Sequence, residues 1–266
     1  MTSIANLYTQ PSPSAQVFRG TVRVNYYIGD TIVKKSAGSG FFFEFPVENG
    51  GVICLVTAKH VTLGASKISF LLAERGAGNI PDVSNPLQFD VPQGSIIYHP
   101  VADICVAPIG PTINKFFNEG RKPWPFAWRP EGLPTPEFLD QLRWIEDVFM
   151  VGCPAGIYDE ERLIPIARRV TTATPLHIDY KGEKKFLVDG HVYTGSSGSP
   201  IILINEGQIS LPGGMTQVGV VRTSLLGIVT DTLFASDHTE IGLGVCLKSS
   251  VLLDFIKLLP NTKLES

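Results

Sequence analysis

The sequence predicts an all-β protein made of two antiparallel β-barrels, with a proline- and tryptophan-rich linker between them and a helix at the C-terminus. Two observations support this. Short runs of β-branched and aromatic residues, separated by Gly, Pro and Asn, fill residues 17–110 and recur over 148–247, a pattern typical of antiparallel barrels or sandwiches. The stretch between them contains RKPWPFAWRPEGLPTP, which interrupts strands and favours a linker folded against both halves.

The expected elements follow this division. Residues 1–16 are expected to form a flexible arm. Residues 17–110 contain the strand candidates VFRGTVRVNYYI, TIVKK, GFFFEF, VICLVT, KISFLL, LQFDV and ICVAPI. A short helix is expected in PEFLDQLRWIED, within the linker 111–147. The candidates in 148–247 include DVFMVG, KKFLVD, PIILI, TQVGVV, LLGIVT and GLGVCL. Residues 248–266 are predicted to form a helix and tail, because SSVLLDFIKLL spaces its apolar residues helically behind serines.

Composition narrows the function classes. The chain has 266 residues, of which 44% are apolar and 18% charged. This balance is neither that of a disordered chain nor that of a membrane span. The net charge of −3 comes without a basic stripe, so neither nucleic acid nor a membrane is expected as a partner. The first residues lack the basic start and apolar core of a secretion signal, and a cytoplasmic location is expected.

Four cysteines lie far apart in apolar settings, and no CxxC pair suggests a metal site. Free buried thiols in a reducing compartment are favoured over disulfides. The residues are Cys54, Cys105, Cys153 and Cys246.

The stretch VYTGSSGSPIIL places Ser196, Ser197 and Ser199 in a glycine-flanked loop before an apolar run. Glycine and serine are common in turns, so the loop alone is equally a tight turn before a buried strand. A nucleophilic serine would need a base to take its proton, a carboxylate to orient that base, and backbone donors for the oxyanion.

Two residues could supply the base and the carboxylate. His60 ends the apolar run VICLVTAKHV, and Asp103 opens the apolar run in VADICVAPI. Each alone is an ordinary strand-end histidine or turn cap, but together with the serine loop they indicate a triad. An α/β-hydrolase is excluded on two grounds. Its elbow reads G-x-S-x-G, whereas Ser197 is followed directly by Gly198, and its chain order is serine, acid, histidine, whereas the histidine comes first here.

These motifs resemble those of the trypsin-like (chymotrypsin-fold) serine peptidases, especially the HtrA-like and intracellular bacterial branches. TAKH is similar to their TAxH motif, ADICV to D-[IL]-A-[VL], GSSGSP to G-[DN]-S-G-G-P, AGSGFFF to the GSGF strand, and LLGIVT to the strand lining the substrate cleft. The resemblance implies His60 as general base, Asp103 as the group that orients it, and Ser197 as nucleophile. The N–H groups of Gly195 and Ser197 would form the oxyanion hole. No metal or cofactor is implied.

Three positions depart from the family pattern. Ser196 replaces the aspartate that binds a freed N-terminus in secreted members, so activation by N-terminal cleavage is not expected. Val61 replaces a cysteine that often follows the histidine, in agreement with a chain without disulfides. Ser199 replaces a glycine and need not disturb the nucleophile.

The resemblance also suggests specificity residues. His191 lies where the base of the primary pocket is built, Thr230 would support Asp103, and the backbone near Asp231 would pair with substrate. Thr232, β-branched where many relatives have glycine, would narrow the pocket toward small or polar side chains. Alternatively, His191 and Asp231 are solvated loop residues.

Other conspicuous residues are given structural roles. His99 is expected at the surface, and His177 and His238 are expected to be ordinary residues as well. The tryptophans are expected to pack between the domains, with an exposed aromatic patch as the alternative. They are Trp124, Trp128 and Trp144.

The function expected on these grounds is a serine endopeptidase that hydrolyses polypeptides through an acyl-enzyme intermediate. One alternative is an inactive peptide-binding module on the same fold. Another is a serine esterase or acyltransferase, because the triad itself serves amides and esters alike. The sequence leaves the natural substrate, the oligomeric state and any regulatory partner open.

Overall fold

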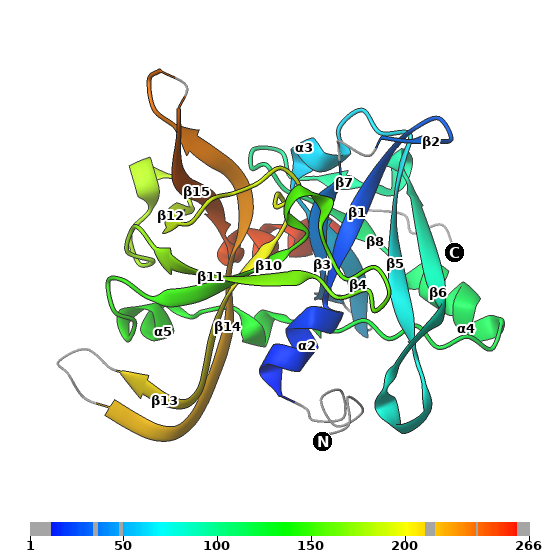
Figure 1. Ribbon diagram of the computed structural model, residues 1–266, viewed down its shortest axis with the longest axis horizontal. Helices are drawn as coiled ribbons and strands as arrows, with labels where there is room; N and C mark the ends of the chain where they lie inside the picture. The colour runs from blue at the N-terminus through cyan, green and yellow to red at the C-terminus, as the bar shows by residue number, and fades with distance from the viewer. Residues whose placement is uncertain (1–11, 34–36, 48–49, 211–215, 238, 260–266) are drawn as a thin grey trace.

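The computed structural model places two β-structures side by side, the first on the right of Figure 1 and the second on the left. It describes residues 12–33, 37–47, 50–210, 216–237 and 239–259. The prediction of a mainly β, two-barrel protein is confirmed. None of the helices in these ranges has the length and apolar character needed to cross a membrane.

The first half is a nine-stranded sheet with the path β6-β5-β1-β3-β4-β8-β7, to which β2 and β9 attach at β1 and β3. All its pairings are antiparallel except that of β3 with β9. Its strands are β1 (Thr21–Ile28), β2 (Thr31–Ile32), β3 (Gly38–Val47), β4 (Gly50–Thr57), β5 (Lys67–Arg75), β6 (Pro81–Pro92), β7 (Ile97–Tyr98), β8 (Cys105–Pro108) and β9 (Ala127–Trp128).

The second half is a closed barrel with the order β10-β11-β12-β15-β14-β13. Closure of the sheet on itself limits the free strand edges, which is the usual solution for an antiparallel sheet. Its strands are β10 (Asp147–Gly152), β11 (Ile166–Thr172), β12 (Lys185–Asp189), β13 (Pro200–Ser210), β14 (Thr216–Phe234) and β15 (Glu240–Lys248).

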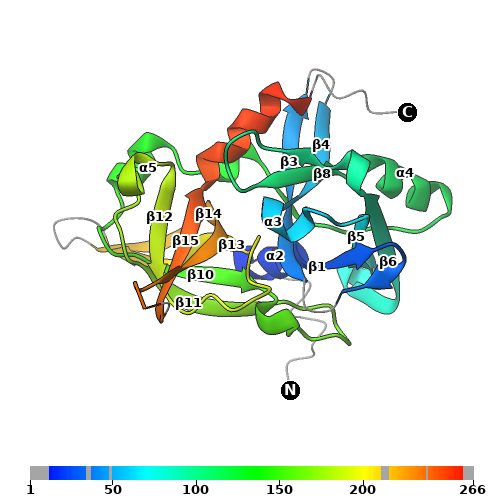
Figure 2. The same ribbon diagram turned by 90° about the horizontal axis from the view of Figure 1, so that it is seen from above.

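Short helices connect and cap the two halves. In Figure 2 the C-terminal η8 crosses between them, and α3 lies at the centre of the molecule. The helices are α2 (Pro13–Arg19), α3 (Lys59–Thr62), α4 (Gly110–Asn118), α5 (Pro136–Asp140), η2 (Ala77–Asn79), η3 (Gln93–Ser95), η4 (Pro130–Gly132), η5 (Pro154–Gly156), η6 (Tyr180–Gly182) and η8 (Ser249–Lys257).

The structure differs from the sequence prediction at the N-terminal boundary. The sequence predicts that the first strand starts at Val17, but residues 17–19 form the end of α2 instead. Ser12 caps this helix by accepting from the N–H of Ala15, and Pro13 suits its first position. The expected arm overlaps α2 from Pro13 onward, and its first eleven residues lie outside the described ranges.

A second difference concerns the hairpin after the serine loop. The runs TQVGVV and LLGIVT, expected as separate strands, belong to the single strand β14. The polar residues between them stay in the ladder, because Arg222 pairs with Asn205 of β13 both in register and through its side chain. Figure 1 shows the resulting β13–β14 hairpin extending away from the barrel.

Three apolar clusters hold the fold together. One lies within each half, and the third joins them, combining Phe41 of β3, Ile228 of β14 and Phe255 of η8. Burial of this shared cluster fixes the halves relative to each other, because separating them would expose its aromatic rings to water. The cleft between the halves is therefore built on a rigid base.

The cysteine and tryptophan predictions have different outcomes. All four cysteines are buried and free, as predicted. Only Trp128 packs in the shared cluster. Trp124 instead lies under the guanidinium groups of Arg19 and Arg75, and Trp144 is 67% exposed.

Candidate active site

His60 and Asp103 meet because β4 and β8 are paired. The register matches Thr57, the last residue of β4, with Cys105, the first residue of β8. In an antiparallel pair, the residues that follow one strand and those that precede the other share an edge of the sheet. His60 in α3 and Asp103 before β8 therefore lie side by side although they are distant in sequence.

Both oxygens of Asp103 contact His60. Oδ2 lies 2.7 Å from the ring Nδ1, and Oδ1 accepts the backbone N–H of His60 at 3.0 Å. The two side chains are 47% and 39% exposed. When Nδ1 carries the proton and donates a hydrogen bond to Asp103, Nε2 has a free lone pair for use as a base.

The same contact shifts both pKa values. The hydrogen bond that the ring donates to Asp103 raises the pKa of His60 above its ordinary value, against partial burial, and the charges of Asp103 and Asp231 add to the rise. Burial by itself would raise the pKa of Asp103. The hydrogen bonds and charge of His60 outweigh it, so the pKa of this carboxyl lies below its ordinary value.

The three serines of the GSSGSP loop differ in access. Ser196 and Ser199 are 1% and 0% exposed, and their hydroxyl oxygens are buried without a hydrogen-bond partner. Ser197 is partly exposed and lines the same groove as His60 and Asp103. Of the three, only Ser197 is placed to meet a reagent in the groove.

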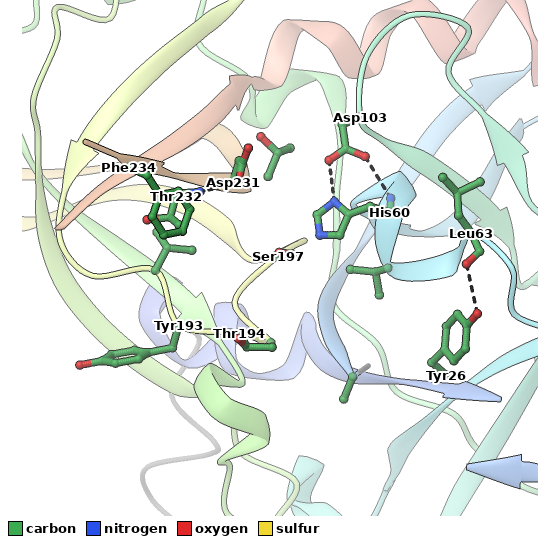
Figure 3. A pocket seen from close by; sticks show the side chains of 15 residues that line it. Tyr26, His60, Leu63, Asp103, Tyr193, Thr194, Ser197, Asp231, Thr232 and Phe234 are labelled. Carbon is green, nitrogen blue, oxygen red and sulfur yellow. Dashed lines mark hydrogen bonds and ion pairs between the residues drawn. The ribbon is translucent and has the colours of Figure 1, made fainter. Parts of the chain in front are cut away.

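Figure 3 shows the side chains around this groove, with Ser197 beside the imidazole of His60. No hydrogen bond joins Ser197 Oγ to His60 in the described residues, and such bonds often form only when substrate is bound. The groove has a volume of about 730 Å3. Its walls are Tyr26, Ala37, His60, Val61, Leu63, Asp103, Val192, Tyr193, Thr194, Gly195, Ser197, Thr230, Asp231, Thr232 and Phe234.

The backbone of the loop is set by two glycines with left-handed φ, +90° at Gly195 and +88° at Gly198. A Cβ on Gly195 would lie 2.7 Å from the carbonyl of Cys153, and one on Gly198 would collide with the carbonyl of Ser39. Both positions thus need glycine for conformation and for space.

Two N–H groups of this loop have no partner among the hydrogen bonds of the described residues. They belong to Gly195 and Ser197, whereas those of Ser196, Gly198 and Ser199 donate to protein carbonyls. Backbone N–H groups left free beside an accessible hydroxyl can stabilise an oxyanion. This is the pair that the sequence predicts.

Ser39 of β3 links the two halves beneath the loop, a role that the sequence prediction missed. Its Oγ donates to the carbonyl of Gly195 at 2.7 Å and accepts the N–H of Cys153 at 2.8 Å. Its N–H donates to the carbonyl of Ser197 at 2.8 Å, and its carbonyl accepts from Thr57 Oγ1 at 2.7 Å. The only signal in the sequence was its place in the GSGF motif.

The predicted support of Asp103 by Thr230 is not seen in the described part of the chain, where Thr230 Oγ1 donates to the carbonyl of Val245 at 3.3 Å. Thr232 Oγ1 likewise turns to β15, donating to the carbonyl of Leu243 at 3.2 Å. Both threonines and Asp231 line the groove as expected for substrate contacts. Their contribution to specificity stays a prediction.

His191 does not line the groove. Its Nδ1 lies 3.4 Å from Glu240 Oε1, its ring stacks on Tyr193, and its side chain is 58% exposed. Val192 and Tyr193 line the groove in its place. The sequence could not reveal this, because the orientation of the His191 side chain depends on its contact with Glu240, which is distant in sequence at the start of β15.

His99, expected at the surface, is buried with 9% exposure. Its Nδ1 accepts the N–H groups of Val101 and Ala102, and its Nε2 lies 3.5 Å from Asp254. It therefore shapes the loop that leads into Asp103, because these bonds close the turn just before that residue.

Neither a protein-family model nor a curated protein sequence matches the chain. Solved structures do. The HtrA-type protease AlgW with a tripeptide matches with a TM-score of 0.54 and 16% identity over 93% of this chain, which spans 62% of the AlgW chain. The serine endoprotease of Yersinia pestis matches at 0.51, with 15% identity over 94% of this chain and 67% of that one.

The protease domain of MamO from Magnetospirillum magneticum gives a TM-score of 0.51 and 15% identity, covering 91% of this chain and 97% of that domain. At such identities the likeness concerns the fold. The chain therefore has the two-barrel fold of the HtrA-type, trypsin-like serine proteases.

Proposed function

We propose that this protein is a serine endopeptidase that hydrolyses peptide bonds through Ser197, His60 and Asp103. One observation carries the proposal. The only accessible serine of its loop shares a groove with a histidine that a carboxylate holds at two atoms, and the N–H groups of that serine and of Gly195 are free. Each component has an ordinary structural explanation, but the combination is what acyl transfer requires.

In the proposed reaction, Nε2 of His60 takes the proton of the Ser197 hydroxyl while Oγ attacks the carbonyl carbon of the substrate. The resulting oxyanion accepts hydrogen bonds from the N–H groups of Gly195 and Ser197. His60 then gives the proton to the leaving amine, the C–N bond breaks, and an acyl-Ser197 ester remains. Water, deprotonated by His60, attacks the ester carbonyl, the bond to Oγ breaks as His60 returns the proton to Ser197, and the acid is released.

Asp103 supports each of these steps without exchanging a proton. Its carboxylate accepts from Nδ1 and so keeps Nε2 available as the basic nitrogen. It also stabilises the imidazolium that forms when His60 holds the proton. The backbone N–H bond to Oδ1 ties the carboxylate to the residue that it orients.

The test is the digestion of a complex peptide mixture by the purified chain, with new termini identified by mass spectrometry. Wild type is expected to produce internal cleavages that Ser197→Ala does not. Ser196→Ala is a matched control, because its hydroxyl is buried and unpartnered, and it should cleave like wild type. Cleavages that persist in Ser197→Ala, or their absence from wild type, would contradict the proposal.

The same preparations distinguish a peptidase from an esterase. Matched amide and ester substrates of one acyl group are offered to wild type and Ser197→Ala. A peptidase hydrolyses both through Ser197, whereas turnover of the ester alone would replace the proposed function with that of an esterase.

A further inference from the structure

The groove that contains Ser197 is acidic. Among its lining residues, which all lie in the described part of the chain, are the carboxylates of Asp103 and Asp231, but no lysine or arginine. Asp103 is committed to His60. Asp231 is therefore the carboxylate of the groove that remains for an incoming group.

Asp231 has no cationic partner among the ion pairs of the described residues. Its side chain accepts one hydrogen bond within the described ranges, from the N–H of its neighbour Thr232 to Oδ1 at 2.8 Å. The residue is exposed. A carboxylate with a free oxygen at the wall of a binding groove favours ligands that bring a positive charge.

The threonines on either side of Asp231 are engaged with the neighbouring strand. The hydroxyls of Thr230 and Thr232 both donate to carbonyls of β15, at Val245 and Leu243. A register shift between Val229 and Asp231 interrupts the ladder here, and whereas Thr230 is buried, Asp231 is exposed. In Figure 3 it stands between Thr232 and the Asp103–His60 pair.

A second cavity, of about 490 Å3, meets the groove at this residue. Asp103, Thr230 and Asp231 line both spaces. The wall of the second cavity is apolar at Val245 and Leu247. A side chain with a long aliphatic stem and a cationic head could lay its stem along this wall and place its head at Asp231.

The other charged groups of the second cavity are already paired. Lys185 contacts Glu183 at 2.6 Å, and Lys184 lies 3.5 Å from Asp254. Because these groups are paired with one another, Asp231 is the carboxylate that remains to bind an added cation. Arg168, a nearby cation outside the groove, stacks on Tyr193 and donates to the carbonyl of His191.

We propose that Asp231 and the cavity behind it form a subsite for a lysine or arginine side chain of the substrate, close to the cleaved bond. This inference rests on the proposed function, because the subsite is defined by its position relative to the bond that Ser197 would cleave. It adds the substrate class, polypeptides with a basic residue at one position flanking that bond.

The test uses sets of peptides that differ at one position at a time, within three residues of a cleaved bond, and carry Lys, Gln or Glu there. Wild type is expected to cleave the Lys peptide about twofold to fivefold faster than the Gln peptide at one position, a range set by a partly solvated charge pair. The preference should shrink as salt is added.

Asp231→Asn keeps the shape of the side chain and should reduce the Lys-to-Gln ratio to near one. Asp231→Lys should invert the preference in favour of Glu. Asp140→Asn, an exposed aspartate at the end of α5, is the matched control and should keep the wild-type ratio. Because each ratio is measured on one enzyme, an altered basicity of His60 cancels from the comparison.

Binding separates this inference from the proposed function. Fluorescently labelled Lys and Gln peptides are titrated into Ser197→Ala, with and without Asp231→Asn. If no peptide is cleaved but Lys binding still depends on Asp231, the subsite stands and the peptidase proposal fails. If wild type cleaves without a Lys preference, or the preference survives in Asp231→Asn, the subsite is overturned.

Discussion

Asp103 holds His60 at two atoms, the ring Nδ1 at 2.7 Å and the backbone N–H at 3.0 Å. The first contact selects the tautomer of the ring. The second fixes the carboxylate to the start of α3, so the ring and its orienting group cannot shift independently. The pairing of β4 with β8 places both at one edge of the first sheet.

Replacing this carboxylate with an amide tests its role. Asp103→Asn is expected to lower kcat by about ten-thousand-fold, the size of the effect in a related triad, because the amide can stabilise the wrong tautomer of His60. The measurement is the turnover of a peptide that wild type cleaves. A near-normal kcat, with an unchanged melting temperature, would remove Asp103 from the site.

The pH dependence of the reaction follows from the raised pKa of His60. The base works when neutral, so kcat/KM should rise with pH, with a midpoint above the ordinary histidine value of about 6.5. The charge of Asp231 contributes to the raised pKa of His60, so Asp231→Asn should move the midpoint to lower pH. A midpoint that stays in place or moves upward in this variant would contradict the assignment of the titrating group.

Replacing Ser39, which lies beneath the serine loop, should affect catalysis as well as stability. Ser39→Ala leaves the carbonyl of Gly195 and the N–H of Cys153 without their partner, which should cost about 1–3 kcal/mol of the free energy of unfolding. Because Gly195 carries an oxyanion donor, kcat should fall more than KM rises.

Ser224→Ala is the matched control for this prediction, since its buried hydroxyl donates to the carbonyl of Gly132 and not to the serine loop. It should lower the melting temperature with little change in kcat. Equal kinetic behaviour of the two variants would show that Ser39 acts on stability alone.

Gly198 and Gly207 have similar φ angles, so comparing them separates the cost of the left-handed conformation from the cost of a steric clash. Gly198 has φ +88° and no room for a Cβ, whereas Gly207 has φ +96° and nothing within 4 Å of that position. Gly207→Ala should cost about 1 kcal/mol from the left-handed conformation alone. Gly198→Ala should cost clearly more and abolish activity, as measured by chemical unfolding and peptide turnover. Equal losses of stability would contradict the packing described at Ser39.

The sequence was sufficient for the fold class, for the order of His60, Asp103 and Ser197, and for the loop glycine at 195. These features depend on local patterns, namely strand periodicity, a histidine at a strand end and glycine where φ is positive. Their meeting in one groove depends on strand register, which the motif order implies only through resemblance to known proteins.

The remaining features depend on tertiary contacts. Thr230 bonds to β15 and His191 turns to Glu240 because those partners are near in space and distant in sequence. His99 is buried because its ring closes the turn before Asp103. The helix at Pro13 had a local signal, the serine cap before a proline, which the run of β-formers after it obscured.

The most direct test of the central claim is labelling by a fluorophosphonate probe, which reacts with activated serines, followed by peptide mapping. The label is expected on Ser197 in wild type, Ser196→Ala and Ser199→Ala, and absent from Ser197→Ala and His60→Ala. Label on another residue, label that survives in Ser197→Ala, or a wild-type chain that melts cooperatively but takes up no label would contradict the assignment of Ser197 as the nucleophile.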